Sequence, residues 1–93
     1  MMAGYRVIIL PPAADGLNSI PSASELVRVK DALGKLLERP ENPKPYEAKE
    51  RKGAWEMHVG RWKVTYEIRR IELVVYVHAI KESPSWAFDY RNN

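Results

Sequence analysis

The chain has 93 residues, of which 45% are hydrophobic and 29% are charged. That length fits one domain with one core, and the composition excludes an intrinsically disordered chain and a membrane protein. The absence of cysteine excludes a disulfide scaffold, thiolate zinc sites and thiol catalysis. An early apolar run, residues 7–10, ends at two prolines before it reaches the length of a signal sequence or a membrane span. We therefore expect a single soluble domain over residues 1–93, located in the cytoplasm and without a membrane partner.

The net charge of +3 is concentrated in the middle of the chain. Residues 44–70 contain eight basic and four acidic residues, so this segment holds the whole positive balance. The basic residues are Lys44, Lys49, Arg51, Lys52, Arg61, Lys63, Arg69 and Arg70. Such a segment suits a polyanionic partner such as RNA, because phosphate contacts supply affinity that does not depend on base sequence. An ordinary solvated surface is the simpler explanation of the charge alone.

The chain opens with one predicted strand and a short helical segment. Residues 5–10 are rich in β-branched side chains and precede two prolines, so we expect a short strand there. Residues 13–20 allow one or two helical turns, because a glycine, an asparagine and a following proline limit their length.

A longer helix is predicted next. Ser22 and Glu25 form a capping box, and apolar residues recur at helical spacing after it. The residue before Pro40 disfavours helical backbone, so the helix is expected to end near Arg39. Residues 41–53 follow as a proline-bearing basic loop.

Beyond residue 53 the apolar period changes to two. Residues 55–59 and 62–68 alternate apolar and polar side chains around Gly60 and Arg61, which fit a two-residue turn with glycine first. This turn fixes an antiparallel hairpin in which Val59 faces Trp62. Residues 73–80 form a long apolar run, which indicates another strand, buried on both faces.

These elements predict an α+β fold with the order β-α-α-β-β-β. Its four-stranded sheet is mainly antiparallel, and the helices cover one face. Strict alternation along the last strand places Ala79 on the core face, and His78 and Ile80 on the open face. A short aromatic tail at residues 84–93 carries Trp86, Phe88 and Tyr90, and it should dock, because three unshielded aromatic rings would form an exposed apolar patch.

The hairpin register gathers polar side chains on the open face. His58 faces Lys63, and Glu56 lies diagonally from Lys63, within reach of long side chains. His78 joins them from the last strand. A carboxylate, two imidazoles and an ammonium group meet the needs of acid–base cleavage of RNA: a base for the 2′-OH, an acid for the leaving oxygen and a cation for the phosphate.

Several roles within this cluster stay open. Either Glu56 or His58 can serve as the base, while Lys63, with Arg61 or Arg69, can hold the phosphate. Trp86 or Tyr90 can stack on a base. Metal binding is disfavoured, since separate strands do not guarantee convergent ligands. On spacing alone, the simpler interpretation is a solvent face with weak cross-strand ion pairs.

Residues 53–68, GAWEMHVGRWKVTYEI, resemble the hairpin of the RelE/ParE superfamily of bacterial toxins. The resemblance extends to the order of elements and implies a RelE/ParE-like fold. In that family, some toxins cut messenger RNA on the ribosome without metal, others poison DNA gyrase, and a cognate antitoxin neutralises both.

The resemblance also implies roles for individual residues. Lys63 stands where the family has its phosphate-holding arginine, whereas His58 replaces an arginine and Glu56 a frequent basic residue. Beyond Ile80 the family often has an arginine and a closing tyrosine, and this chain instead reads Lys-Glu-Ser-Pro-Ser-Trp.

We therefore expect the toxin of a type II toxin–antitoxin pair, acting as a metal-independent endoribonuclease on ribosome-bound mRNA. Its expected catalytic residues are Glu56, His58 and Lys63, and its expected RNA-binding residues are Lys49, Arg51, Lys52, Arg61, Arg69, His78 and Trp86. No cofactor or metal is expected, and the expected partners are an antitoxin, mRNA and the ribosome. The alternatives are a toxin of the same fold that inhibits DNA gyrase or another target without cleavage, and a structural domain.

Overall fold

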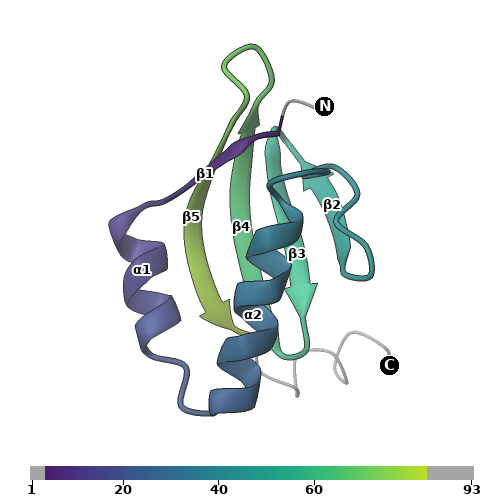
Figure 1. Ribbon diagram of the computed structural model, residues 1–93. Coiled ribbons are helices and arrows are strands. Elements are labelled where there is room, and N and C mark those ends of the chain that lie inside the picture. The colour runs from purple at the N-terminus through teal and green to yellow at the C-terminus, as the bar shows by residue number, and fades with distance from the viewer. Residues whose placement is uncertain (1–3, 84–93) are drawn as a thin grey trace.

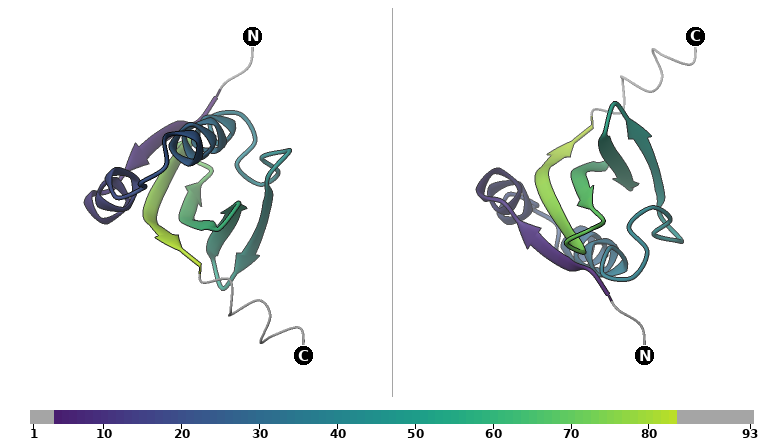
Figure 2. Two further views of the ribbon diagram at one scale, coloured as in Figure 1. Left: turned by 90° about the horizontal axis from the view of Figure 1, so that it is seen from below. Right: turned by 90° about the horizontal axis from the view of Figure 1, so that it is seen from above.

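The computed structural model describes residues 4–83 of the chain, which form two helices and five strands (Figure 1). The elements are β1 (Arg6–Ile9), α1 (Pro11–Asn18), α2 (Ala23–Lys35), β2 (Glu47–Arg51), β3 (Ala54–Val59), β4 (Trp62–Arg69) and β5 (Val74–Glu82). The five strands form one sheet in the order β1-β5-β4-β3-β2, in which β1 is parallel to β5 and all other pairs are antiparallel. Both helices lie on one face of this sheet (Figure 2). The predicted α+β class and the mainly antiparallel sheet are confirmed.

The sheet has one strand more than the sequence predicts. β2 lies within the segment expected to be a loop, and it pairs with β3 along its whole length. Lys52 and Gly53 connect the two strands, both with positive φ values, of 53° and 85°. Backbone of this kind closes a tight hairpin turn, so β2 folds back onto β3 although its sequence, EAKER, has almost no apolar side chains.

The helices begin where their sequences favour a start. The two prolines that end β1 occupy the first positions of α1, where a missing N–H costs no hydrogen bond, so this helix starts earlier than predicted. Ser22 caps α2 by accepting a hydrogen bond from the backbone N–H of Glu25 at 3.3 Å, which confirms the capping box. No helix in residues 4–83 has the length and apolar character needed to cross a membrane.

The core lies between the helices and the sheet. From the helices and the C-cap of α2 come Ala13, Val29, Ala32, Leu33 and Leu36, and from the sheet come Met57, Val59, Trp62, Val64, Tyr66, Val75, Val77 and Ile80. Burial of each of the larger apolar side chains stabilises the folded state by roughly 1.5–3 kcal/mol relative to leaving it exposed to water. The fully buried Tyr66 donates its hydroxyl to the carbonyl oxygen of Pro40 at 2.6 Å, which ties β4 to the segment after α2.

The β3–β4 register is as predicted: Val59 pairs with Trp62 and His58 pairs with Lys63. The β4–β5 register differs, because a bulge interrupts it between Thr65 and Tyr66. Thr65 pairs with Ala79 and Tyr66 with Val77, so His78 is the extra residue on β5.

The bulge corrects the predicted faces of the last strand. Ile80, expected on the open face, is buried in the core, and Ala79 lies across from Thr65. His78 is exposed, as expected, but the bulge aims it toward a different partner from the one predicted. Strict alternation fails here because one inserted residue reverses the faces of all residues beyond it.

Candidate functional site

The candidate site lies on the sheet face opposite the helices. Met57 and Val64 are buried under the helices, so the side chains that alternate with them on β3 and β4 point to the other face. Glu56, His58 and Lys63 are therefore brought together there, each partly exposed. The Lys63 ammonium lies 3.9 Å from Oε2 of Glu56, and Lys63 is the direct cross-strand partner of His58. We call these three residues the open-face cluster.

Neighbouring strands add charged residues on both sides of the open-face cluster. Glu47 on β2 pairs with His58, and Lys49 pairs with Glu56. On the other side, Lys81 of β5 pairs with Lys63. Ammonium groups from β2, β4 and β5 thus lie on the same face as the Glu56 carboxylate and the His58 imidazole. Lys49 and Lys63 were predicted to bind RNA or phosphate, whereas Glu47 and Lys81 were missed.

A surface pocket of about 430 Å³ opens beside the open-face cluster. Its walls are the segment 42–46, the first residues of β2, and Glu56 and His58 of β3. The two residues expected to exchange protons therefore line a hollow that can accept a ligand.

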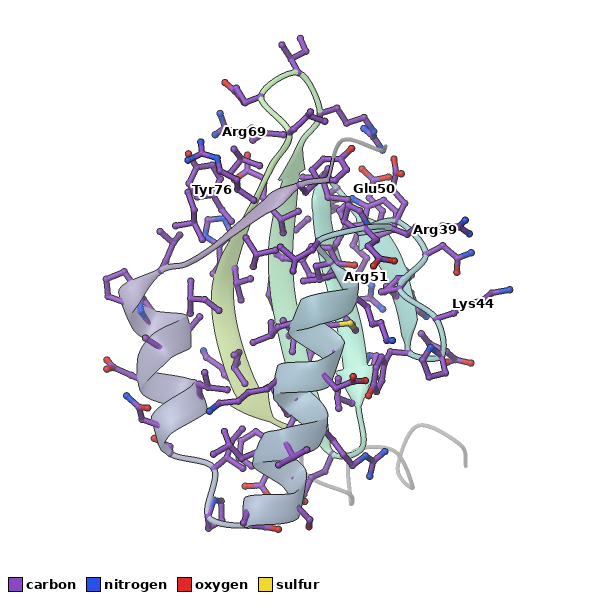
Figure 3. All side chains as sticks on the ribbon, viewed as in Figure 1. Arg39, Lys44, Glu50, Arg51, Arg69 and Tyr76 are labelled. Carbon is purple, nitrogen blue, oxygen red and sulfur yellow. The ribbon has the colours of Figure 1, made fainter. Side chains whose placement is uncertain are left out.

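A second polar group lies further along the same face. Glu67 accepts a hydrogen bond from Nε of Arg69 at 2.6 Å and contacts Nε2 of His78 at 3.1 Å. These contacts lower the pKa of Glu67, with the bond from Arg69 as the larger cause. The Arg69 guanidinium also lies 5.6 Å from the centre of the Tyr76 ring, and both residues are seen at one end of the sheet (Figure 3).

This second group adjoins the open-face cluster on the Glu56 side. Glu67 lies four residues along β4 from Lys63, a distance of about 14 Å in an extended strand, but only two residues from Thr65, the cross-strand partner of Glu56. His78 and Arg69, both predicted to bind RNA, contact Glu67 and therefore lie beside the open-face cluster.

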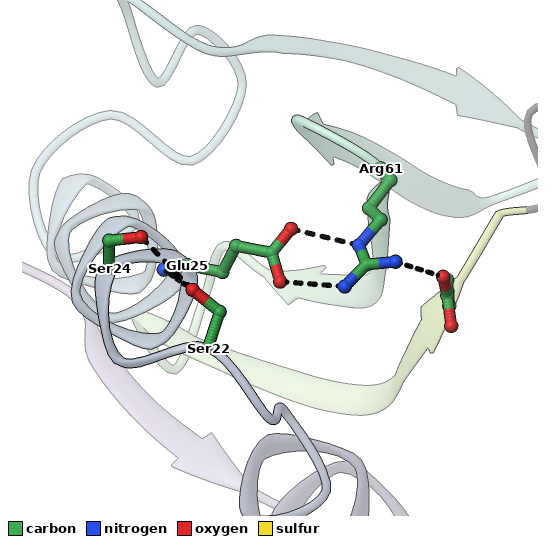
Figure 4. A network of polar contacts seen from close by, with 5 residues as sticks. Ser22, Ser24, Glu25 and Arg61 are labelled. Atoms are coloured by element: carbon green, nitrogen blue, oxygen red, sulfur yellow. Dashed lines mark hydrogen bonds and ion pairs between the residues drawn. The ribbon is translucent and has the colours of Figure 1, made fainter.

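Arg61 lies at the tip of the β3–β4 hairpin and contacts two carboxylates (Figure 4). Its Nε and Nη2 donate to Glu25 of α2 at 2.8 Å and 2.9 Å, and its Nη1 donates to Glu82 of β5 at 2.6 Å. Hydrogen bonding to Arg61 is the largest cause that lowers the pKa of Glu25, and the bond to Glu25 is the largest cause that raises the pKa of Arg61. The structure thus places this predicted RNA-binding residue in a clamp that joins three elements.

The remaining predicted residues lie around the edges of the site. Arg51 is the last residue of β2, and Lys52 follows it in the turn to β3; both are exposed. Trp86 and the rest of the aromatic tail at residues 84–93 lie outside the described residues. Within residues 4–83, no three His, Asp or Glu side chains converge as metal ligands do.

Sequence signals for the missed residues are weak. Glu47 and Lys49 alternate with Ala48, but one small apolar residue between charged neighbours does not mark a strand. The pairing of Lys81 with Lys63 cannot be predicted without the bulge, because the bulge shifts the register between β4 and β5.

Comparisons with known proteins bear on the fold. No protein-family model matches the chain, and no curated protein sequence matches it. Several solved structures do match. The structure of the archaeal RelE–RelB complex from Pyrococcus horikoshii OT3 matches with a TM-score of 0.72 and 21% identity, covering 87% of this chain and 96% of that chain.

Two further structures have the same architecture. The RelBE2 toxin–antitoxin complex from Mycobacterium tuberculosis has a TM-score of 0.68 and 21% identity, covering 85% of this chain and 98% of that chain. The isolated RelE toxin of E. coli has a TM-score of 0.63 and 13% identity, covering 95% of this chain and 97% of that chain. The chain therefore has the RelE toxin fold, which confirms the fold implied by the hairpin sequence.

Proposed function

We propose that the chain is the toxin of a type II toxin–antitoxin pair and that it cuts ribosome-bound mRNA at the open-face cluster. The observation that carries this proposal is the grouping of Glu56, His58 and Lys63 on the sheet face opposite the helices of a RelE fold. A carboxylate, an imidazole and an ammonium group within cross-strand distance supply the parts that acid–base cleavage requires.

The proposed reaction uses the 2′-OH of the RNA as its own nucleophile. One member of the pair Glu56 and His58 takes the 2′-OH proton, and the 2′ oxygen attacks the adjacent phosphorus. The bond to the 5′ oxygen breaks, and the other member of the pair donates a proton to that oxygen. The products are a 2′,3′-cyclic phosphate and a 5′-hydroxyl, so atoms and charges balance without a metal or a cofactor.

Lys63 has a different task in this scheme. Its ammonium group holds the phosphate and opposes the negative charge that grows on it during attack. Lys81, the cross-strand partner of Lys63, places a second ammonium group on the same face. The chain has no arginine at the end of β5, where the RelE/ParE resemblance would lead one to expect it, and Lys81 is the basic residue that β5 carries there.

The partner proposed for this chain is a cognate antitoxin. Four of the matching structures are RelE–RelB or RelBE complexes. A second candidate function, inhibition of DNA gyrase or of another target without cleavage, is favoured by the same missing arginine.

Induced expression in a bacterial host tests the proposal. We expect growth arrest with new mRNA 5′ ends in primer extension, both lost in Glu56→Gln/His58→Ala. Glu38→Gln, which alters an exposed carboxylate just beyond α2, is the matched control and should arrest growth fully. Arrest without new ends would move the function to gyrase or another binding target, and arrest that persists in the double variant would exclude the open-face cluster.

A further inference from the structure

The sheet face opposite the helices continues beyond the open-face cluster onto β5 and β1. On β1, Val7 and Ile9 pack against the core, and on β5 the core residues are Val75 and Val77. Successive side chains of a strand point to opposite faces, so the residues that alternate with these four lie on the same face as the open-face cluster.

Two rows of side chains cross this part of the sheet, because β5 pairs with β1 on one side and with β4 on the other. The two rows, which we call the arginine platform, are Arg6, Val74 and Arg69, and beside them Ile8, Tyr76 and Glu67. Neighbouring strands are about 4.8 Å apart, so the backbones that carry Arg6 and Arg69 are about 10 Å apart. Two long side chains at that spacing can reach one anion.

Arg69 is held from two sides. Its Nε donates to Oε2 of Glu67 at 2.6 Å, and its guanidinium lies over the Tyr76 ring, 5.6 Å from the ring centre (Figure 3). Within residues 4–83, the two terminal nitrogens of Arg69 make no hydrogen bond. A guanidinium fixed in this way presents two N–H donors whose geometry matches the oxygens of a phosphate, and little conformational entropy is lost on binding.

The remaining charges of the arginine platform favour an anion. Arg6 is exposed and, in the part of the chain that the structure describes, makes no ion pair. Two guanidinium groups against the single carboxylate of Glu67 leave the platform positive. Between them the partly exposed Tyr76 supplies an aromatic ring. Guanidinium groups beside an aromatic ring match the chemistry of a nucleotide, which joins an anionic phosphate to a base that stacks on such planes.

We propose that the arginine platform binds one unpaired nucleotide of the message. The inference rests on the proposed ribonuclease function and adds a site that holds the RNA strand while the open-face cluster acts. The base stacks on the layered pair of Arg69 and Tyr76, and Arg6 with the terminal nitrogens of Arg69 holds a phosphate. Arg69 lies six residues along β4 from Lys63, about 20 Å in an extended strand, so the bound nucleotide is farther along the RNA than the cleaved step.

Binding of an uncleavable RNA tests the platform without catalysis. The probe is a fluorescent 2′-O-methyl RNA of about ten nucleotides without secondary structure, titrated with the full chain at several salt concentrations. We expect Arg6→Gln to weaken binding and to reduce the slope of log K against log salt by about 0.7, the value for one lost phosphate contact. Arg28→Gln, which removes an exposed arginine of α2 on the helix side, is the matched control and should change neither quantity. An unchanged slope in Arg6→Gln, or an equal loss in Arg28→Gln, would overturn the proposal.

A second pair of variants tests the ring. Tyr76→Leu should weaken RNA binding about tenfold or more, and Tyr76→Phe, which keeps the ring, should bind as the wild-type chain does. Urea unfolding shows whether Tyr76→Leu is folded, and wild-type affinity in the folded variant would contradict stacking. Because Arg6 is exposed, Arg6→Gln decides the proposal even where Tyr76→Leu does not fold.

An acidic protein segment is the competing occupant of the arginine platform. If a poly-glutamate peptide displaces the RNA and binds as tightly to folded Tyr76→Leu as to the wild-type chain, the platform recognises carboxylates and the nucleotide assignment is wrong.

Failure of the platform and failure of the enzyme give different results. If the chain cuts mRNA but Arg6→Gln and Tyr76→Leu bind RNA as the wild-type chain does, cleavage stands and the platform is wrong. If both variants lose RNA binding while the wild-type chain cuts no mRNA, the platform stands and the chain is an RNA binder that does not cleave.

Discussion

Glu25 and Arg61 form a two-point ion pair across 36 residues of sequence. Glu25 sits in the first turn of α2, and Arg61 sits in the turn between β3 and β4. The Arg61 side chain also bonds to Glu82. The backbone carbonyl oxygen of Arg61 accepts a hydrogen bond from the backbone N–H of Ser83 at 2.7 Å. The pair therefore fixes the helix against the turn of the hairpin whose two strands carry the open-face cluster.

The stability supplied by Glu25 should depend on pH. Its pKa is lowered in the folded chain from an ordinary value of 4.5, so its contribution is complete above about pH 4.5 and is lost as pH falls through the lowered value. We expect Glu25→Gln to lower the urea midpoint at pH 7 and to lose this effect in acid. A double-mutant cycle with Arg61→Gln isolates the pair, and a coupling that does not change with pH would contradict the assignment.

Gly16 marks a close approach between α1 and β5. A Cβ added there would lie 2.1 Å from the carbonyl oxygen of Ile80, which is backbone and cannot move aside cheaply. Gly16→Ala should therefore destabilise the fold by about 1–3 kcal/mol, although alanine favours helix. Gly34→Ala is the matched control in α2, where an added Cβ would meet no atom from outside its own stretch of helix within 4 Å, and it should stabilise by about 0.5–1 kcal/mol. Equal effects of the two substitutions in urea unfolding would contradict the close approach.

Tyr66→Phe tests the buried hydrogen bond to Pro40. Removal of the hydroxyl leaves the Pro40 carbonyl without its donor, and we expect a loss of about 1–3 kcal/mol in urea unfolding. Burial raises the pKa of the Tyr66 phenol, with a smaller contribution from Glu41.

The same phenol predicts an alkaline limit to stability. Since its pKa is raised above the ordinary value of 10.0, the unfolded chain ionises first and stability falls as pH rises above about 10. This loss should be smaller in Tyr66→Phe. If the free energy of unfolding falls equally in the wild-type chain and in Tyr66→Phe between pH 9 and 11, the Tyr66 phenol does not cause the alkaline loss of stability.

The sequence predicts those parts of the fold that local chemistry decides. Gly60 with Arg61 and the alternation on either side determine the β3–β4 register, and Ser22 with Glu25 determines the start of α2. The open-face cluster follows from that register, because partners on adjacent strands of a hairpin can be paired by counting from the turn.

The parts that depend on distant contacts were not predicted. β2 is charged along both faces, and it forms because the backbone at Lys52 and Gly53 turns it onto β3. The bulge exchanges the sheet faces of Ala79 and Ile80, and a continuous apolar run in the sequence gives no signal of its position. Likewise, Arg61 belongs to a basic segment in the sequence, and only the fold shows the two carboxylates that it contacts.

Lys63 and Lys81 should differ in their effects on RNA. Lys63→Gln should lower the rate of cleavage by about 10²–10³, because its charge acts on the transition state, and Lys63→Arg should retain most of the activity. Lys81→Gln should instead weaken binding of single-stranded RNA and reduce the salt dependence of log K by about 0.7, the value expected for one lost phosphate contact. Fluorescence anisotropy at several salt concentrations and single-turnover cleavage measure the two effects. A larger loss of cleavage rate in Lys81→Gln than in Lys63→Gln would reverse the assigned roles.

The most direct test of acid–base RNA cleavage at the open-face cluster is single-turnover cleavage of a ribosome-bound message that carries one 2′-deoxynucleotide at the mapped cleavage position. We predict that the wild-type chain cuts the all-ribose message, leaves the deoxy message intact at that position, and loses at least about 10² in rate in Glu56→Gln/His58→Ala. Cleavage of the deoxy message at the same position, or a wild-type rate in the double variant, would contradict it.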